Sequence, residues 1–455
     1  MLVSVVLIAA IVVGLYMAWN IGANDVANAM GTSVGSGALT VRQAIILAGI
    51  FEFCGALVVG GAVAETIRKG IVDIDVLRRS ASVSGRCPSA APTSGPGGGQ
   101  ADLSMQAKTT AGLSAAAEEA LRTKVMLGML SSLLAAALWL NVATFFGQPV
   151  STTHAIIGAV VGFAVIEAGP GSVIWPKMGK IAASWVISPV VGGAVAFLIY
   201  RCIRRYILRN RDPVAMARRA VPLCFGLVVF VLAISVLIKV FHVDLTASDL
   251  FLFVPLALVL AMATVVIARL VLWRRDRNRQ YPPEERYQVV EKWFGRIQPI
   301  NACYKAFAHG ANDVANAIGP LAAIVHMASG GALGSKAPVP LWLLVLGGGG
   351  IVVGLATYGY KVMEAVGKKI TEITPTRGFG AEFATASTVL VCSVMGLPIS
   401  TTFVLVGAVM GVGLARGFGA IDLRVIRRIF ASWLITIPVS AVFAAVIYKL
   451  LMYLT

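Results

Sequence analysis

Long apolar runs separated by short polar stretches dominate the chain. Runs of about 18 or more apolar residues recur, and each is long enough to cross the hydrocarbon core of a bilayer as a helix. Several runs are interrupted by glycine, proline or polar residues, which favours broken or re-entrant helices. The segments predicted to span are 2–20, 43–64, 125–146, 150–168, 180–200, 221–241, 250–272, 300–327, 340–364, 383–397, 399–416 and 430–452. We therefore expect an all-α integral membrane protein with about 12 transmembrane segments.

The composition agrees with this pattern. The 455 residues are 58% hydrophobic and only 13% charged, whereas soluble proteins carry roughly 25% charged residues. The 6 cysteines and 4 histidines lack the paired spacing that disulfide frameworks and zinc-type sites need. The sequence therefore predicts no cofactor and no transition-metal site.

The basic residues set the expected orientation. The formal net charge is +17, and the loops 201–219 and 273–296 each hold seven lysines or arginines. The positive-inside rule makes their side cytoplasmic, and five crossings in either direction bring both termini to the extracytoplasmic side of the cell membrane. Because the charge is confined to such loops, nucleic acid is not an expected partner. A cleavable signal peptide is not expected either, since no basic residue precedes Arg42.

Three motifs occur twice along the chain. They are GANDVANA at 22–29 and 310–317, PVSTTHAIIGAVVG at 149–162 with PISTTFVLVGAVMG at 398–411, and KIAASWVISPVVGG at 180–193 with RIFASWLITIPVSA at 428–441. By the crossing count the two GANDVANA copies lie seven crossings apart, so they run in opposite directions. Two inverted-topology repeats with a binding site near the midplane are the architecture of secondary transporters.

The repeats divide the chain into three parts. Residues 1–200 form the first repeat and 297–455 the second, while 201–296 hold the basic loops and an inserted transmembrane hairpin at 221–272. Residues 71–123 are rich in Gly, Pro, Ser and Ala, which predicts a flexible extracytoplasmic loop without a packed core.

Each GANDVANA motif carries one aspartate at membrane depth. A charged side chain at the bilayer centre costs at least about 2.5–3.5 kcal/mol, so Asp25 and Asp313 need partners. The nearest lysine or arginine to either is Lys305, eight positions before Asp313, which makes a bound small cation or a proton the less costly partner. Gly22 and Gly310 are expected to let the backbone open and offer its carbonyls. Amide oxygens, which suit sodium-like ions, come from Asn24, Asn28, Asn312 and Asn316.

Each PxSTT motif predicts the start of a helix. Proline followed by serine and threonine before an apolar run is a helix N-terminus signal, and such an end carries unpaired N–H groups and a partial positive charge. Hydroxyls beside it make a site for an oxyanion. The hydroxyl residues are Ser151, Thr152 and Thr153 in the first copy and Ser400, Thr401 and Thr402 in the second. An ordinary N-cap is the alternative interpretation, and the duplication weakens it.

Carboxylates and anion-binding helix ends in one site imply coupling. Like charges ~4 Å apart repel by about 4 kcal/mol at an effective dielectric of about 20. An oxyanion therefore binds beside Asp25 and Asp313 only after cations or protons have bound. This order of binding is the requirement for ion-coupled symport. Glu52 and Glu382 lie in apolar surroundings and are expected to form an additional cation site or a gate. We interpret His309 as a local polar contact and not as a metal ligand.

With these motifs the chain resembles the inorganic phosphate transporter (PiT) family. The resemblance is carried by both GANDVANA copies, PVSTTH and PISTTF, and is strengthened by the FE dipeptide at 51–52, ETIRKGI at 65–71 and the ASW motifs. It implies symport of inorganic phosphate with sodium or protons, a transport domain against a scaffold, and a homodimer. Phe403 stands where the first copy has His154, which leaves the number of coupling ions open.

The resemblance also implies roles for the residues that match the family motifs. The two aspartates and the six hydroxyl residues would bind phosphate. The coupling cations would be bound by Asn24, Asp25, Asn28, Asn312, Asp313, Asn316, Glu52 and Glu382.

Sodium-coupled import of inorganic phosphate is the favoured function, because FE and ETIRKGI resemble the sodium-coupled members. Proton-coupled phosphate symport, metal–phosphate symport and sulfate transport on the same fold stay open. Phosphate has a P–OH that can donate to Asp25 or Asp313, whereas sulfate at neutral pH has none, and such donors discriminate strongly between ligands. An enzyme is not expected, since a hydrolase or phosphotransferase needs a nucleophile–base pair or a metal cluster and neither PxSTT motif has a basic partner. A passive channel would not need aspartates that demand cations.

Overall fold

The structure is a computed structural model that describes most of the chain. The described residues are 2–26, 30–31, 33–34, 37–69, 71–84, 115–145, 150–241, 247–276, 281–333, 339–360, 374–417 and 423–455. Asn28, Pro149 of the first PxSTT motif, and most of the predicted loop 71–123 lie outside this part of the chain.

The described residues are all-helical apart from turns and one isolated bridge between Val72 and Val173. The first half contains α1 (Leu2–Ile21), η1 (Gly22–Val26), α3 (Val41–Val58), α4 (Gly60–Lys69), α5 (Ile74–Ser84), α7 (Ala115–Phe145), α8 (Thr152–Ala168), η2 (Pro170–Ser172), α9 (Trp175–Cys202) and η3 (Ile203–Leu208). The second half contains α10 (Pro213–Val240), α11 (Ala247–Asp276), α12 (Arg286–Gly295), α13 (Gln298–Ala328), α14 (Leu341–Gly354), η4 (Leu355–Gly359), α16 (Pro375–Val394), α17 (Thr401–Arg416) and α18 (Leu423–Leu454).

Within the described residues, 8 helices are long and apolar enough to cross a membrane. They lie at Val3–Val26, Val41–Val58, Ala116–Phe145, Trp175–Leu208, Pro213–Ile238, Phe251–Val271, Leu341–Gly359 and Leu434–Leu454. Each predicted segment overlaps a helix, but α8 and α17 are shorter apolar helices. The all-α, multi-spanning class is therefore confirmed. The number of twelve segments and the inverted relation of the repeats stay predictions.

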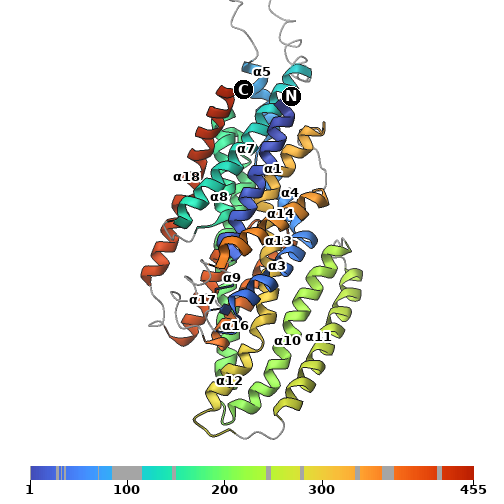
Figure 1. The fold of residues 1–455 in the computed structure, drawn as a ribbon, viewed down its shortest axis with the longest axis vertical. Helices are drawn as coiled ribbons and strands as arrows, with labels where there is room; N and C mark the ends of the chain where they lie inside the picture. The colour runs from blue at the N-terminus through green and yellow to red at the C-terminus, as the bar shows by residue number, and fades with distance from the viewer. Residues whose placement is uncertain are drawn as a thin grey trace, which may run out of the picture.

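The centre of the bundle is α13. This helix is buried along nearly its whole length and packs against α1, α3, α4, α7 and α16, so its polar residues lie inside the protein. Figure 1 shows α10 and α11 side by side at one flank, and both chain termini at the same end of the molecule. The side of the membrane that this end faces stays a prediction.

The segment 71–123 contains more helix than the sequence predicted. Ile74–Ser84 form α5, and α7 already begins at Ala115. Leu77 is buried, and Nη2 of Arg78 lies 3.1 Å from Oε1 of Glu118, so α5 is held against α7. Composition missed this helix because a short amphipathic stretch was averaged with the Gly- and Pro-rich residues that follow it.

Gly22 and Gly310 allow helices to approach closely. The expectation that Gly310 opens the backbone is wrong, because it lies inside the continuous helix α13. A Cβ atom on Gly310 would lie 2.1 Å from the carbonyl oxygen of Glu52, and one on Gly22 would lie 1.9 Å from that of Ile351. Only glycine permits such contacts, which bring α13 against α3 and η1 against α14.

Two glycines on α14 provide a matched test of this packing. A Cβ on Gly354 would lie 2.0 Å from the carbonyl oxygen of Trp19, whereas one on Gly349 would meet nothing within 4 Å. We expect Gly354→Ala to lower the melting temperature of the detergent-solubilised protein, since overpacking costs about 1–3 kcal/mol. Gly349→Ala should keep or raise it, because alanine favours a helix over glycine by about 1 kcal/mol. Equal melting temperatures for the two variants would contradict the close packing of α14 on α1.

Candidate functional site

The two GANDVANA copies have different backbones. Gly22–Val26 form the π-helix η1 at the end of α1, whereas the second copy continues the regular helix α13. π-helical turns occur frequently at functional sites. Because the two sequences are nearly identical, the difference arises from what each copy packs against.

Asp25, on η1, is a buried carboxylate. The residue is 3% exposed, Thr152 lies near its carboxylate, and within the described residues neither of its oxygens has a hydrogen bond of ordinary geometry. An oxygen of Asp25, a ring nitrogen of His309 and an oxygen of Asp313 all lie within 4.8 Å of one another. An unpaired buried charge is costly, so the carboxylates of Asp25 and Asp313 are suited to a cation.

His309 lies between two carboxylates from different helices. Its Nδ1 is 3.0 Å from Oε1 of Glu52 on α3, and its Nε2 is 2.8 Å from Oδ2 of Asp313. Asp313 also accepts hydrogen bonds from Thr401 Oγ1 at 3.2 Å and from Asn312 Nδ2 at 2.6 Å. Because both ring nitrogens face carboxylate oxygens, the geometry favours the imidazolium form, in which both nitrogens are donors.

The PxSTT motifs start helices α8 and α17. Ser151 is the N-cap of α8 and accepts a hydrogen bond from the amide of His154 at 3.2 Å. Ser400 is the N-cap of α17 and accepts one from the amide of Phe403 at 3.4 Å. Both serines are buried, so two helix N-termini, each with a partial positive charge, begin inside the protein.

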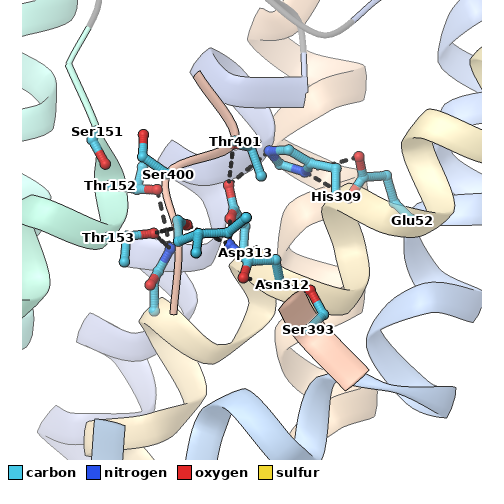
Figure 2. A network of polar contacts seen from close by, with 12 residues as sticks. Glu52, Ser151, Thr152, Thr153, His309, Asn312, Asp313, Ser393, Ser400 and Thr401 are labelled. Atoms are coloured by element: carbon cyan, nitrogen blue, oxygen red, sulfur yellow. Dashed lines mark hydrogen bonds and ion pairs between the residues drawn. The ribbon is translucent and has the colours of Figure 1, made fainter. Parts of the chain in front are cut away.

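Asparagines of α13 connect these helix starts. Asn316 Nδ2 donates to Thr152 Oγ1 at 3.1 Å and to Thr153 Oγ1 at 3.2 Å. Thr153 donates to the carbonyl of Ile399 at 3.0 Å, and this carbonyl also accepts from Asn312 Nδ2 at 2.8 Å. Figure 2 shows the network that joins the starts of α8 and α17 to α13 and, through the histidine, to α3. Hydroxyls and carboxylates from both halves of the chain, and amides of the second GANDVANA copy, therefore meet in one buried cluster.

Two other predicted residues lie apart from this cluster. The side-chain amide of Asn24 donates to Thr144 on α7. Glu382 on α16 is buried and accepts hydrogen bonds from Ser33 Oγ at 3.0 Å and from Asn301 Nδ2 at 3.3 Å. The structure thus contains a second buried acidic position whose oxygens, unlike those of Asp25, are hydrogen-bonded by the protein.

A small cavity adjoins the cluster. Its volume is about 20 Å³, which is room for roughly one water molecule. Its polar lining consists of Asp25, Lys305, His309, Thr385, Thr401 and Thr402. A tetrahedral oxyanion is larger than a water molecule, so the site has to widen before it admits one.

The sequence did not reveal the central position of His309. Its contact with Asp313 follows from helical i, i+4 spacing, but its contact with Glu52 depends on the packing of α13 against α3. Thr385 lines the cavity, and Ser393 donates to Asn312 Oδ1 at 3.5 Å. Neither residue belongs to a repeated motif, so no sequence signal marks either of them.

Ionisable groups and helix starts gathered inside a bundle of apolar, membrane-spanning helices define a membrane transport protein. Comparison with known proteins identifies the family. The chain matches the phosphate transporter family over residues 21–91 and 99–444, and it belongs to that family. It is a multi-pass membrane transporter and not an enzyme.

Individual relatives cover nearly the whole chain. A predicted phosphate permease of Pyrococcus furiosus is 43% identical over 454 residues, which are 100% of this chain and 98% of the relative. The inorganic phosphate transporter 2-1, chloroplastic, of Arabidopsis thaliana is 42% identical over 467 residues, covering 96% of this chain and 71% of its own length. A solved structure titled "The sodium-dependent phosphate transporter" is 36% identical and superimposes with a TM-score of 0.84 over 99% of this chain and 100% of its own.

Proposed function

We propose that the chain is a symporter that imports inorganic phosphate across the cell membrane together with sodium ions. The observation that carries this proposal is Asp25, which is buried with no hydrogen bond of ordinary geometry to its oxygens among the described residues and lies close to Asp313 and His309. Carboxylate oxygens are ligands that sodium-like hard cations prefer. Sodium is proposed here as a co-transported substrate and not as a resident cofactor.

Phosphate is proposed to bind between the starts of α8 and α17. Helix N-termini with adjacent hydroxyls are favourable positions for an oxyanion. The carboxylates of Asp25 and Asp313 repel that anion until cations neutralise them, so sodium binds first. By reciprocal linkage, bound phosphate then tightens the binding of sodium. The solved relative, whose title names it as sodium-dependent, supports sodium over protons.

Two predicted cation ligands are proposed to have other roles. Glu382 and Asn24 lie outside the central cluster, where each has its own protein partner. We propose that Glu382 belongs to an additional cation position or to a gate, and that Asn24 orients η1 through Thr144.

Exchanged helix packing supports the division into two inverted repeats, 1–200 and 297–455. A Cβ on Gly158 of α8 would lie 2.6 Å from the carbonyl oxygen of Ile437 on α18, and one on Gly407 of α17 would lie 2.2 Å from that of Pro189 on α9. These positions correspond in the duplicated motifs. In each repeat, the helix that begins with the PxSTT motif therefore packs against the helix of the other repeat that carries the ASW motif. Two-fold related repeats pack in this way. A homodimer with extracytoplasmic termini remains part of the proposal.

Uptake of labelled phosphate into proteoliposomes tests this function. We expect an inward sodium gradient alone to drive uptake, a pH gradient without sodium to drive none, and excess sulfate not to compete. Liposomes without protein are the control. Uptake that depends on the pH gradient and not on sodium would identify protons as the coupling ion. Sulfate uptake without phosphate uptake would assign the site to sulfate.

A further inference from the structure

A wide apolar groove lies between α9, α17 and α18. Its volume is about 760 Å³, and its walls include Val186, Val190, Phe197, Met410 and Leu434. Val186, Val190 and Leu434 are exposed. The groove therefore opens on a face of the protein that the bilayer surrounds.

His154 lines the inner wall of this groove. Its side chain is 3% exposed, and within the described residues neither ring nitrogen has a hydrogen-bond partner. The ring centroid lies 3.8 Å from that of Trp185 and 4.4 Å from that of Phe403, so the imidazole is held in place. A buried polar group without a partner is destabilising, and a ligand that hydrogen-bonds it removes that cost.

We propose that the groove binds a long-chain carboxylic acid whose head group hydrogen-bonds His154. Grooves of about 300–1,000 Å³ accommodate ligands of this size. The apolar walls match a methylene chain, and a neutral imidazole can accept from a carboxylic O–H or donate to a carbonyl. His154 packs on Trp185, well inside α9 (Trp175–Cys202). The head group would therefore lie deep in the membrane, away from the ester carbonyls of bilayer phospholipids, which favours a single-chain acid.

Occupation of the groove should also slow transport. His154 directly follows Thr153, and Phe403 directly follows Thr402, so the inner wall of the groove lies immediately behind both helix starts. An acyl chain bound between α9, α17 and α18 opposes the widening of the central site that admits phosphate. This consequence depends on the proposed function, whereas binding in the groove does not.

Photolabelling tests the binding directly. The full-length protein in phosphatidylcholine vesicles is labelled with diazirine-bearing palmitic acid, and the labelled peptides are mapped. We expect label on α9, α17 and α18 that excess palmitic acid displaces. Ala194→Trp fills the groove from an exposed lining position and should reduce this label at least tenfold. Val191→Trp, on the same helix and exposed but outside the groove, should label like the wild type.

The head-group contact is tested at His154. Loss of one hydrogen bond in His154→Phe should reduce labelling roughly three- to tenfold, while His154→Gln, which keeps a donor and an acceptor, should retain it. Phenylalanine occupies the equivalent position 403, and melting temperatures check that each variant folds. Wild-type labelling of His154→Phe would overturn the head-group assignment.

Equal labelling of the two tryptophan variants, or a second copy of the chain cross-linked across the groove, would overturn the site itself. Labelling needs no transport, so its failure is distinct from a failure of the proposed symport.

Discussion

Replacing Asp25 by asparagine is expected to abolish sodium-driven phosphate uptake, with a loss of at least about 100-fold. The substitution removes a negative charge from the pair of carboxylates, Asp25 and Asp313, whose oxygens lie within 4.8 Å of each other. A charge–cation interaction at ~5 Å and an effective dielectric of about 20 contributes about 3 kcal/mol, which corresponds to roughly 100-fold. The amide has nearly the same shape and no charge to desolvate, so the protein should fold, and its stability without sodium should stay equal or rise.

Two measurements separate loss of coupling from loss of folding. The first is initial uptake of labelled phosphate into proteoliposomes under a sodium gradient. The second is the rise in melting temperature on adding sodium, which reports binding to the native state and should be present in the wild type and absent in Asp25→Asn. Asp75→Asn is the matched control, because that side chain is 80% exposed on α5. Sodium-driven uptake at the wild-type rate in Asp25→Asn would remove this carboxylate from the mechanism.

Much of the fold could be predicted because lipid restricts the structures that can span it. Backbone groups in a bilayer must be paired internally, so long apolar runs identify helices reliably. Hydropathy was less informative for α5, whose short amphipathic stretch of residues 74–84 depends on burial of Leu77 and on the ion pair of Arg78 with Glu118. The helix α13 is also more polar than a lipid-facing span would be. It can be so because protein surrounds it along nearly its whole length.

The candidate site was predictable mainly where the sequence repeats itself, while Glu52 was predicted from its apolar surroundings alone. Asp25, Asp313 and the PxSTT hydroxyls are conspicuous because two copies of each polar motif interrupt apolar runs. The separate positions of Asn24 and Glu382 depend on which neighbours reach them, which a single sequence does not contain. The same is true of the contact between Glu52 and His309, because α3 and α13 are far apart in the chain and are brought together by the glycine contact at Gly310.

His309→Gln is expected to change the binding of the two substrates in opposite directions. In the imidazolium form favoured by its contacts with Glu52 and Asp313, His309 repels a nearby cation and attracts an anion. Glutamine keeps polar contacts but removes this charge. The sodium concentration for half-maximal uptake should therefore fall, and the KM for phosphate at saturating sodium should rise. A charge removed at ~5 Å changes either binding energy by up to about 3 kcal/mol, so the changes can reach roughly 100-fold.

Initial uptake rates measured over a range of sodium concentrations, and separately over a range of phosphate concentrations, distinguish this effect from general damage to the site. General damage would weaken the binding of both substrates, whereas loss of one positive charge weakens only that of the anion. His326→Gln makes the same change near the end of α13 and away from the carboxylate cluster, and it should leave both values unchanged. If sodium and phosphate binding in His309→Gln weakened together, the imidazole would act as a structural link between α3 and α13, and its charge would have no part in balancing the two substrates.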